Sequence, residues 1–202
     1  MGTRIEIIAA GGGGASISTA TLMRTGETTS YRTGDDADTS SEGRATDFFT
    51  LAENNPFGTT DRFTDELGTQ TYTNNIVIDW STFNGSTVLG YRRTRNGVNV
   101  NWNVAIDDSL LVSIGTFTTG WRLPNINELN NLLNWTTTGI NYSPLNIGTN
   151  GSISIWCSTT NPAAATQAYR LNYANVLAPA NKTGSAHYIP CRTFTVTGTI
   201  LT

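Results

Sequence analysis

Apolar residues recur at three- and four-residue spacing after Pro124: Ile126, Leu129, Leu132 and Leu133. This spacing places them on one face of a helix. Asn125 is a suitable N-cap residue, and Glu128 stands at the third helical position of a capping box. The pattern predicts a helix that begins after Asn125 and buries one face.

Short stretches elsewhere alternate apolar and polar residues, as half-buried strands do. β-Branched and aromatic residues are frequent in them, and Gly, Asn and Pro separate them. The predicted strands include residues 71–80, 153–157, 169–173 and 187–194. Residues 99–113 alternate at first and become ambiguous after Asp107, so a strand and a helix both remain open there.

The first residues differ in pattern from the rest of the chain. Residues 4–8 alternate briefly like a strand and then run into four consecutive glycines at 11–14, which are costly to order. We therefore divide the chain into an N-terminal arm or docking segment at 1–24, a domain at 25–197 and a tail at 198–202.

The composition is polar with little charge. Apolar residues make up 38% and charged residues 13% of the 202 residues, with a net charge of −3. This charge argues against nucleic acid or an anionic membrane as the partner. The chain contains neither the stretch of about 18 apolar residues that a membrane span needs nor, near Met1, the apolar core of a secretory signal.

The densest group of carboxylates is Asp35, Asp36 and Asp38. Loops rich in oxygen ligands bind calcium, so these residues are the candidates for a Ca²⁺ site. The alternative is an exposed acidic turn that binds no metal. The spacing does not fit an EF-hand, because no glycine stands at the sixth position from Asp36.

Several landmarks follow one another in an order that resembles a known family. They are residues 25–38, 62–65, 73–75 closing on Trp80, Gly-Trp-Arg-Leu-Pro at 120–124 with Glu128 and Leu129, 156–160, and 191–192. Together they resemble the Lcl-type C-terminal domain of bacterial surface proteins and phage genomes. The resemblance implies an α+β, C-type-lectin-like fold with short antiparallel strands and one or two helices, preceded by the arm.

Within this resemblance the 120–124 segment has a framework role. We expect Trp121 to be buried, Arg122 to donate hydrogen bonds to carbonyls around the core, and Pro124 to set the entry into the helix. These roles hold the fold together and supply no chemistry. We therefore expect a module that binds and is not an enzyme.

Cys157 and Cys191 lie on two strands that the family's topology places near each other. A disulfide between them and two buried free thiols are both open. The enzymatic alternatives are a copper site like that of formylglycine-generating enzymes and a dyad of Cys191 with His187, which an alternating strand places on the same side. The copper pair of those enzymes is closely spaced in sequence, unlike this one.

Loop aromatics and amides are the remaining candidates for recognition, because aromatic faces stack on sugar rings and amides pair with hydroxyls. Their alternative roles are core packing and turn formation. No calcium-and-sugar triplet of sugar-binding C-type lectins is present, so no cofactor is expected beyond the candidate Ca²⁺. The expected ligand-binding residues are Trp135, Asn141, Tyr142, Asn161, Tyr173, Asn175 and Tyr188.

The resemblance and the polar composition indicate a phage particle as the setting, with a bacterial cell surface or the extracellular space as the alternative. In this interpretation the arm at 1–24 binds other virion proteins, and the domain binds a host-surface glycan or protein. A purely structural decoration or cement protein is the second hypothesis. A homo-oligomer is open, and neither nucleic acid nor membrane insertion is expected.

Overall fold

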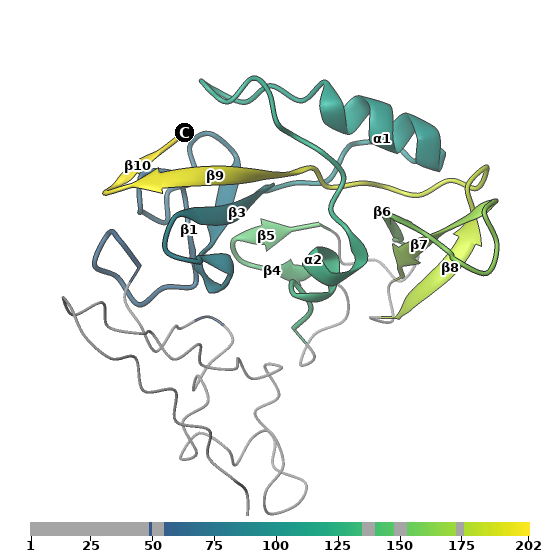
Figure 1. The fold of residues 1–202 in the computed structure, drawn as a ribbon, viewed down its shortest axis with the longest axis horizontal. Helices are drawn as coiled ribbons and strands as arrows, with labels where there is room; N and C mark the ends of the chain where they lie inside the picture. The colour runs from purple at the N-terminus through teal and green to yellow at the C-terminus, as the bar shows by residue number, and fades with distance from the viewer. Residues whose placement is uncertain (1–48, 50–54, 135–139, 148–152, 173–175) are drawn as a thin grey trace, which may run out of the picture.

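The computed structural model describes residues 49, 55–134, 140–147, 153–172 and 176–202. The main element is a five-stranded antiparallel sheet in the order β1-β2-β3-β9-β10 (Figure 1). Its strands are β1 (Phe63–Thr64), β2 (Ile76–Asp79), β3 (Thr87–Arg92), β9 (Cys191–Thr197) and β10 (Ile200–Leu201). The longest pairing, between β3 and β9, joins residues about a hundred positions apart, with Val88 opposite Phe194.

A second, three-stranded antiparallel sheet has the order β6-β7-β8. It is built from β6 (Ile155–Thr160), β7 (Gln167–Leu171) and β8 (Leu177–Asn181), and a small hairpin of β4 (Asn141–Tyr142) and β5 (Leu145–Asn146) precedes it. The expectation of short antiparallel strands with few helices is confirmed. The result is a β-rich fold.

The predicted helix after Asn125 is confirmed as α2 (Ile126–Asn130). Its capping box is present, since the Asn125 side chain accepts from Glu128 N at 3.0 Å and the Glu128 side chain accepts from Asn125 N at 2.8 Å. The helix is shorter than the apolar spacing indicates. Leu132 and Leu133 follow it and are still buried.

The ambiguous segment at 99–113 is a helix, α1 (Trp102–Leu110). Asn101 caps it by accepting a hydrogen bond from Val104 N at 3.0 Å. A further short element, the 3₁₀ helix η2 (Trp80–Thr82), follows β2 directly. None of the helices among the described residues is long and apolar enough to cross a bilayer.

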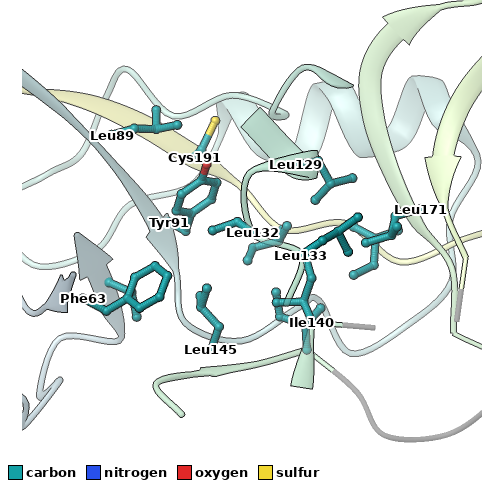
Figure 2. Packing of buried hydrophobic residues seen from close by; sticks show 14 of the residues in the cluster. Phe63, Leu89, Tyr91, Leu129, Leu132, Leu133, Ile140, Leu145, Leu171 and Cys191 are labelled. Carbon is teal, nitrogen blue, oxygen red and sulfur yellow. The ribbon is translucent and has the colours of Figure 1, made fainter. Parts of the chain in front are cut away.

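Alternation along β2 explains how the five-stranded sheet is buried on both faces. Val77 packs into one apolar cluster, whereas Ile76 and Ile78 pack into another with Phe194 and Trp121. Figure 2 shows the first cluster, where the leucines of and after α2 meet residues of both sheets and of the β4–β5 hairpin. A third cluster, around Trp156, fills the space between α1 and the three-stranded sheet.

The segment expected as a tail, 198–202, contains the edge strand of the sheet. It forms a turn and β10, in which Leu201 pairs with Val196 and is buried. The apolar pair Ile200 and Leu201 is too short for a pattern, so its strand pairing is visible only in the folded chain. The N-terminal arm at 1–24 lies outside the described residues.

Gly90 provides a test of the packing between β2, β3 and β9. A Cβ at this position would lie 2.6 Å from Phe194 Cε2 and 2.8 Å from Ile78 Cδ1. We expect Gly90→Ala to lower the free energy of unfolding by about 1–3 kcal/mol through overpacking. The measurement is urea denaturation.

Gly97→Ala is the matched control, because a Cβ there meets nothing within 4 Å. It should change the free energy of unfolding by less than about 0.5 kcal/mol. Equal stability of the two variants would show that the contact between Phe194 and Gly90 is not as tight as described.

Candidate functional site

The 120–124 segment lies between the core and α2. Trp121 is buried, as expected, and its ring packs edge-on against Phe194 with centroids 6.2 Å apart. Its Nε1 donates to Phe117 O at 2.8 Å, so the indole nitrogen is satisfied inside the core. Pro124 O accepts from Ser158 N at 2.8 Å, which ties the start of α2 to β6.

Arg122 has a different partner from the one expected. Its guanidinium makes a bidentate pair with Glu128, at 2.7 Å and 2.6 Å, and only a long contact of 3.4 Å with the carbonyl of Leu123. The backbone of Arg122 exchanges two hydrogen bonds with Cys191, at 2.9 Å and 2.8 Å. The segment therefore joins α2 to β9.

Glu128 consequently has two structural functions, the cap of α2 and the partner of Arg122. Burial favours its neutral form, but the hydrogen bonds from Arg122 and Asn125 outweigh this effect and hold the pKa of Glu128 below its usual value. An ionised carboxylate that is fully engaged in hydrogen bonds is a poor proton acceptor. The role of Glu128 and Arg122 is therefore structural.

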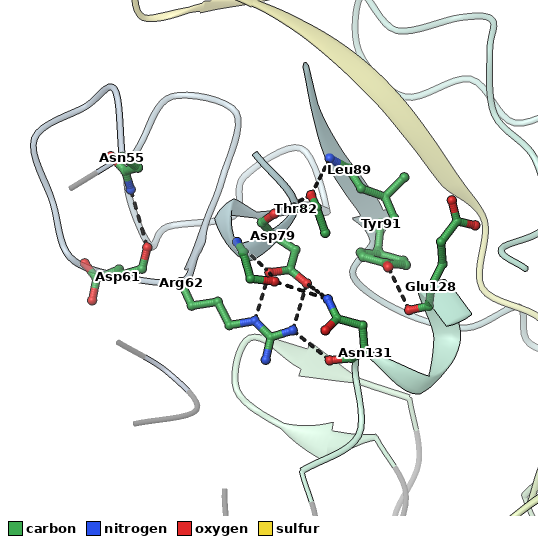
Figure 3. A network of polar contacts seen from close by, with 10 residues as sticks. Asn55, Asp61, Arg62, Asp79, Thr82, Leu89, Tyr91, Glu128 and Asn131 are labelled. Carbon is green, nitrogen blue, oxygen red and sulfur yellow. Dashed lines mark hydrogen bonds and ion pairs between the residues drawn. The ribbon is translucent and has the colours of Figure 1, made fainter. Parts of the chain in front are cut away.

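The most deeply buried charges are Arg62 and Asp79, which sequence reasoning did not single out as a pair. Arg62 Nε and Nη2 lie 2.8 Å and 2.9 Å from the two Asp79 carboxylate oxygens, and both side chains are fully buried. Arg62 Nη2 also donates to Asn131 O at 2.7 Å, and Ser81 Oγ donates to Asp79 at 2.6 Å (Figure 3). The network connects β1, η2 and the end of α2.

Asp65 organises the loop between β1 and β2. It accepts hydrogen bonds from Leu67 N at 3.0 Å, Thr69 N at 2.7 Å and Tyr72 N at 3.1 Å. Burial would raise the pKa of Asp65, but these donors and the threonine hydroxyls together hold it below its usual value. The loop includes a left-handed backbone at Tyr72, with φ of 53°.

Cys157 and Cys191 are free thiols buried in the same apolar cluster. Of the two alternatives, the structure therefore has two buried free thiols and no disulfide between them. Cys157 Sγ donates to Tyr169 O at 3.2 Å, whereas Cys191 Sγ lies 4.0 Å from Glu128 Oε2. Burial raises the pKa of both thiols. Protonated thiols are weak nucleophiles.

His187 is not the partner of Cys191. Its ring contacts Arg95, whose Nη1 lies 2.9 Å from Nδ1 and 3.0 Å from Nε2, and Asn96 O, which is 3.1 Å from Nδ1. Burial and the charge of Arg95 lower the pKa of His187, so its ring is neutral at pH 7. The dyad considered as an enzymatic alternative is therefore not formed.

Two of the expected ligand-binding residues have structural contacts. Tyr188 is buried, and its hydroxyl donates to Asp108 at 3.3 Å, so it is not a surface aromatic. Asn161 forms a turn, in which its side chain accepts from Ala163 N at 3.1 Å and donates to Gln167 at 2.9 Å. Both have the alternative role considered above, core packing for Tyr188 and turn formation for Asn161.

The other expected site residues remain predictions. Trp135, Tyr173 and Asn175 lie outside the described residues, as do the calcium candidates Asp35, Asp36 and Asp38. Asn141 and Tyr142 form β4, and their side chains are outside the description. Within the described part of the chain, no three His, Cys, Asp or Glu side chains form a group that could hold a metal ion.

Three exposed aliphatic residues lie in and directly after helix α1, and sequence reasoning missed their exposure. The inner side of α1 packs on β6, where Trp102 Nε1 donates to Cys157 O at 2.8 Å. Val104 and Leu110 of the helix, and the C-cap residue Leu111, are 38%, 58% and 80% exposed. We call these three residues the α1 patch, and Figure 1 shows α1 at the periphery of the molecule. The helix period would have revealed it, had 99–113 been assigned as a helix.

Comparisons of this chain with protein-family models, with curated proteins and with solved structures found no match.

Asp79→Asn tests the buried network. The substitution removes the negative charge that faces the buried guanidinium of Arg62, and we expect a loss of about 3–5 kcal/mol in the free energy of unfolding. Denaturant titration measures it. Glu128→Gln is the comparison, because its partner Arg122 has a side chain that is 39% exposed and glutamine also suits a capping box. It should cost about 1 kcal/mol or less.

His187 is the only histidine, so one NMR resonance reports its titration. Because its folded pKa lies below 6.5, the unfolded chain takes up a proton first as the pH falls. His187 therefore destabilises the fold progressively below pH 6.5 and down to its folded pKa. Arg95→Gln should raise the pKa of His187 towards 6.5. An unchanged pKa in that variant would contradict the electrostatic role of Arg95.

Proposed function

We propose that this protein is a C-type-lectin-like, non-enzymatic binding module on the surface of a phage particle. The framework supports this proposal: the 120–124 segment starts α2, pairs with β9 through Arg122 and Cys191, and buries Trp121. The burial of Trp121 and the start of α2 after Pro124 agree with the roles that the resemblance implies, whereas Arg122 pairs with Glu128 in place of core carbonyls. Because these residues have structural roles, we expect the ligand to bind at the surface of the domain.

The observation that carries the binding function is the α1 patch. Contiguous exposed apolar patches mark interaction surfaces, and we propose that the three residues of the α1 patch act as one. Leu110 ends α1 and Leu111 is its C-cap residue. Val104, seven residues before Leu111, lies on the same side of the helix axis as Leu111, whereas Leu110 is turned about 120° away from Val104. Burying such side chains against a partner removes apolar area from water and stabilises a complex.

The chemistry of the patch favours a protein ligand over a glycan. Sugar sites rely on aromatic stacking and amides, whereas the α1 patch offers aliphatic side chains only. Asp107 and Asp108 lie in the same helix, between Val104 and Leu110. A host-surface protein with an apolar contact surface and basic residues at its edge would complement both features.

The arm at 1–24 is proposed to attach the module to the virion. Under the second hypothesis, a decoration or cement protein, the same patch would bind a neighbouring virion protein. The two hypotheses differ in what remains after the arm is deleted. A receptor-binding module without residues 1–24 should still bind host cells and lose attachment to particles, whereas a cement protein should bind neither cells nor particles.

Leu110→Ser combined with Leu111→Ser tests the patch directly. We expect binding to host cells to weaken at least about tenfold, since interface anchors typically contribute more than 1 kcal/mol each. Flow cytometry of the labelled full-length protein on intact cells is the measurement. The unfolding midpoint should stay nearly unchanged, because both side chains are exposed.

Ile200→Ser is the matched control, since Ile200 is equally apolar and 62% exposed but lies on β10. It should leave cell binding intact. Undiminished binding by the double leucine variant would exclude the α1 patch as the recognition surface. If the unaltered protein bound particles and no cells, the cement hypothesis would replace the proposal.

A further inference from the structure

Two Asn-Gly pairs lie in the described part of the chain, Asn84 with Gly85 and Asn96 with Gly97. In such a pair the glycine has no Cβ to hinder its backbone nitrogen from approaching the asparagine side-chain carbon, Cγ. Attack at this carbon closes a five-membered succinimide ring. The local sequence therefore allows both pairs to form a succinimide, and the surrounding structure determines which pair reacts.

The carbonyl of the Asn84 side chain is surrounded by donors. Its Oδ1 accepts from Thr87 N at 2.9 Å, from Ser86 N at 3.1 Å and from Ser86 Oγ at 3.2 Å. This oxygen takes up the negative charge when a nucleophile adds to Cγ. Donors already aimed at the atom where charge develops stabilise the transition state, as in an oxyanion hole.

The other participating groups at this turn are free to react. Asn84 and Gly85 are exposed, and a Cβ on Gly85 would meet nothing within 4 Å. Among the described residues, neither Asn84 Nδ2 nor Gly85 N has a hydrogen-bond partner, so the leaving amide and the nucleophile are both unengaged. Water reaches the turn from outside.

In contrast to Asn84, Asn96 is buried, and both polar atoms of its side chain are hydrogen-bonded. It is 6% exposed, its backbone N donates to Tyr188 O at 3.1 Å, and its Oδ1 accepts from Tyr188 N at 2.8 Å. Its Nδ2 donates to Val98 O. Loss of this amide as ammonia would break a hydrogen bond in a buried site, and any cyclisation would disturb the contact with Tyr188.

We propose that Asn84 is a self-modification site, at which the folded protein converts asparagine into aspartate and isoaspartate without an enzyme. Gly85 N forms a bond to Asn84 Cγ, and the side-chain amide leaves as ammonia with the proton of Gly85 N. One water molecule then opens the succinimide at either carbonyl. The products carry one additional negative charge, and no oxidation or reduction occurs.

The modification would change a junction between strands. The turn joins η2 to β3, and Ser86 O accepts from Val196 N of β9 at 2.8 Å. Aspartate retains a side-chain oxygen that accepts the same hydrogen bonds. Isoaspartate inserts one more carbon into the main chain, which disturbs the hydrogen bond from Asn84 N to Thr87 O, 3.1 Å in the unmodified turn.

The test is to incubate the folded full-length protein at mildly alkaline pH and to map its peptides by mass spectrometry. The proposal expects the Asn84 peptide to gain about one dalton and to separate into aspartate and isoaspartate forms, while the Asn96 peptide stays unmodified. In urea the two peptides should react at similar rates, because the fold no longer distinguishes them. Equal conversion in the folded protein, or an unchanged difference in urea, would overturn the proposal.

Ser86→Ala separates the hydrogen-bond mechanism from simple exposure. It removes the hydroxyl donor to Asn84 Oδ1 and leaves Asn84 and Gly85 in place. The conversion of Asn84 should slow about fivefold, the rate equivalent of one ordinary hydrogen bond. Conversion at the original rate in this variant would contradict the role assigned to the donors. Thermal unfolding of the variant verifies that the turn is still folded.

Discussion

The ion pair between Arg62 and Asp79 is the interaction on which much of the structure depends. It lies at the place where β1, the end of β2 and the residues after α2 meet, and both charges are fully removed from water. Such a pair contributes little net stability, because desolvation offsets most of the attraction. The two side chains must nevertheless stay in contact, because an arrangement that separates them leaves each charge buried without a partner of opposite charge. The pair therefore specifies how the sheet and α2 meet.

The Gly-Trp-Arg-Leu-Pro segment extends the same principle to the other side of α2. Glu128 caps the helix and holds Arg122, while the backbone of Arg122 pairs with Cys191. Arg122 and Glu128, which are conspicuous in the sequence, thus have structural roles. The buried thiol of Cys191 is protonated, and the imidazole of His187 is neutral. The surface that we propose for partner binding, the α1 patch, lies outside this framework.

Much of the fold could be predicted, and less of the candidate site. The helix after Asn125 was predictable because its cap and its leucines lie within eight residues of one another. The strands near 155 and 169 were predictable from their β-branched and aromatic residues and from the turn residues between them, although the start of β6 is buried on both faces. Tyr188 was misassigned to the surface because a buried tyrosine and an exposed one look the same in the sequence. Asn161 resembled a ligand-binding amide because turn asparagines carry the same functional group.

Local features of the chain were therefore sufficient for helix caps, strand periodicity and turns, whose causes act between residues a few positions apart. Tertiary structure alone decided which charges were paired, where Cys157 and Cys191 were buried, and that Ile200 and Leu201 add an edge strand to the sheet. The physical reason is the distance along the chain: Arg62 finds Asp79 seventeen residues away and Asn131 sixty-nine residues away. No local pattern encodes a contact of that separation. The same holds for the two Asn-Gly pairs, which differ mainly in what the fold places around them.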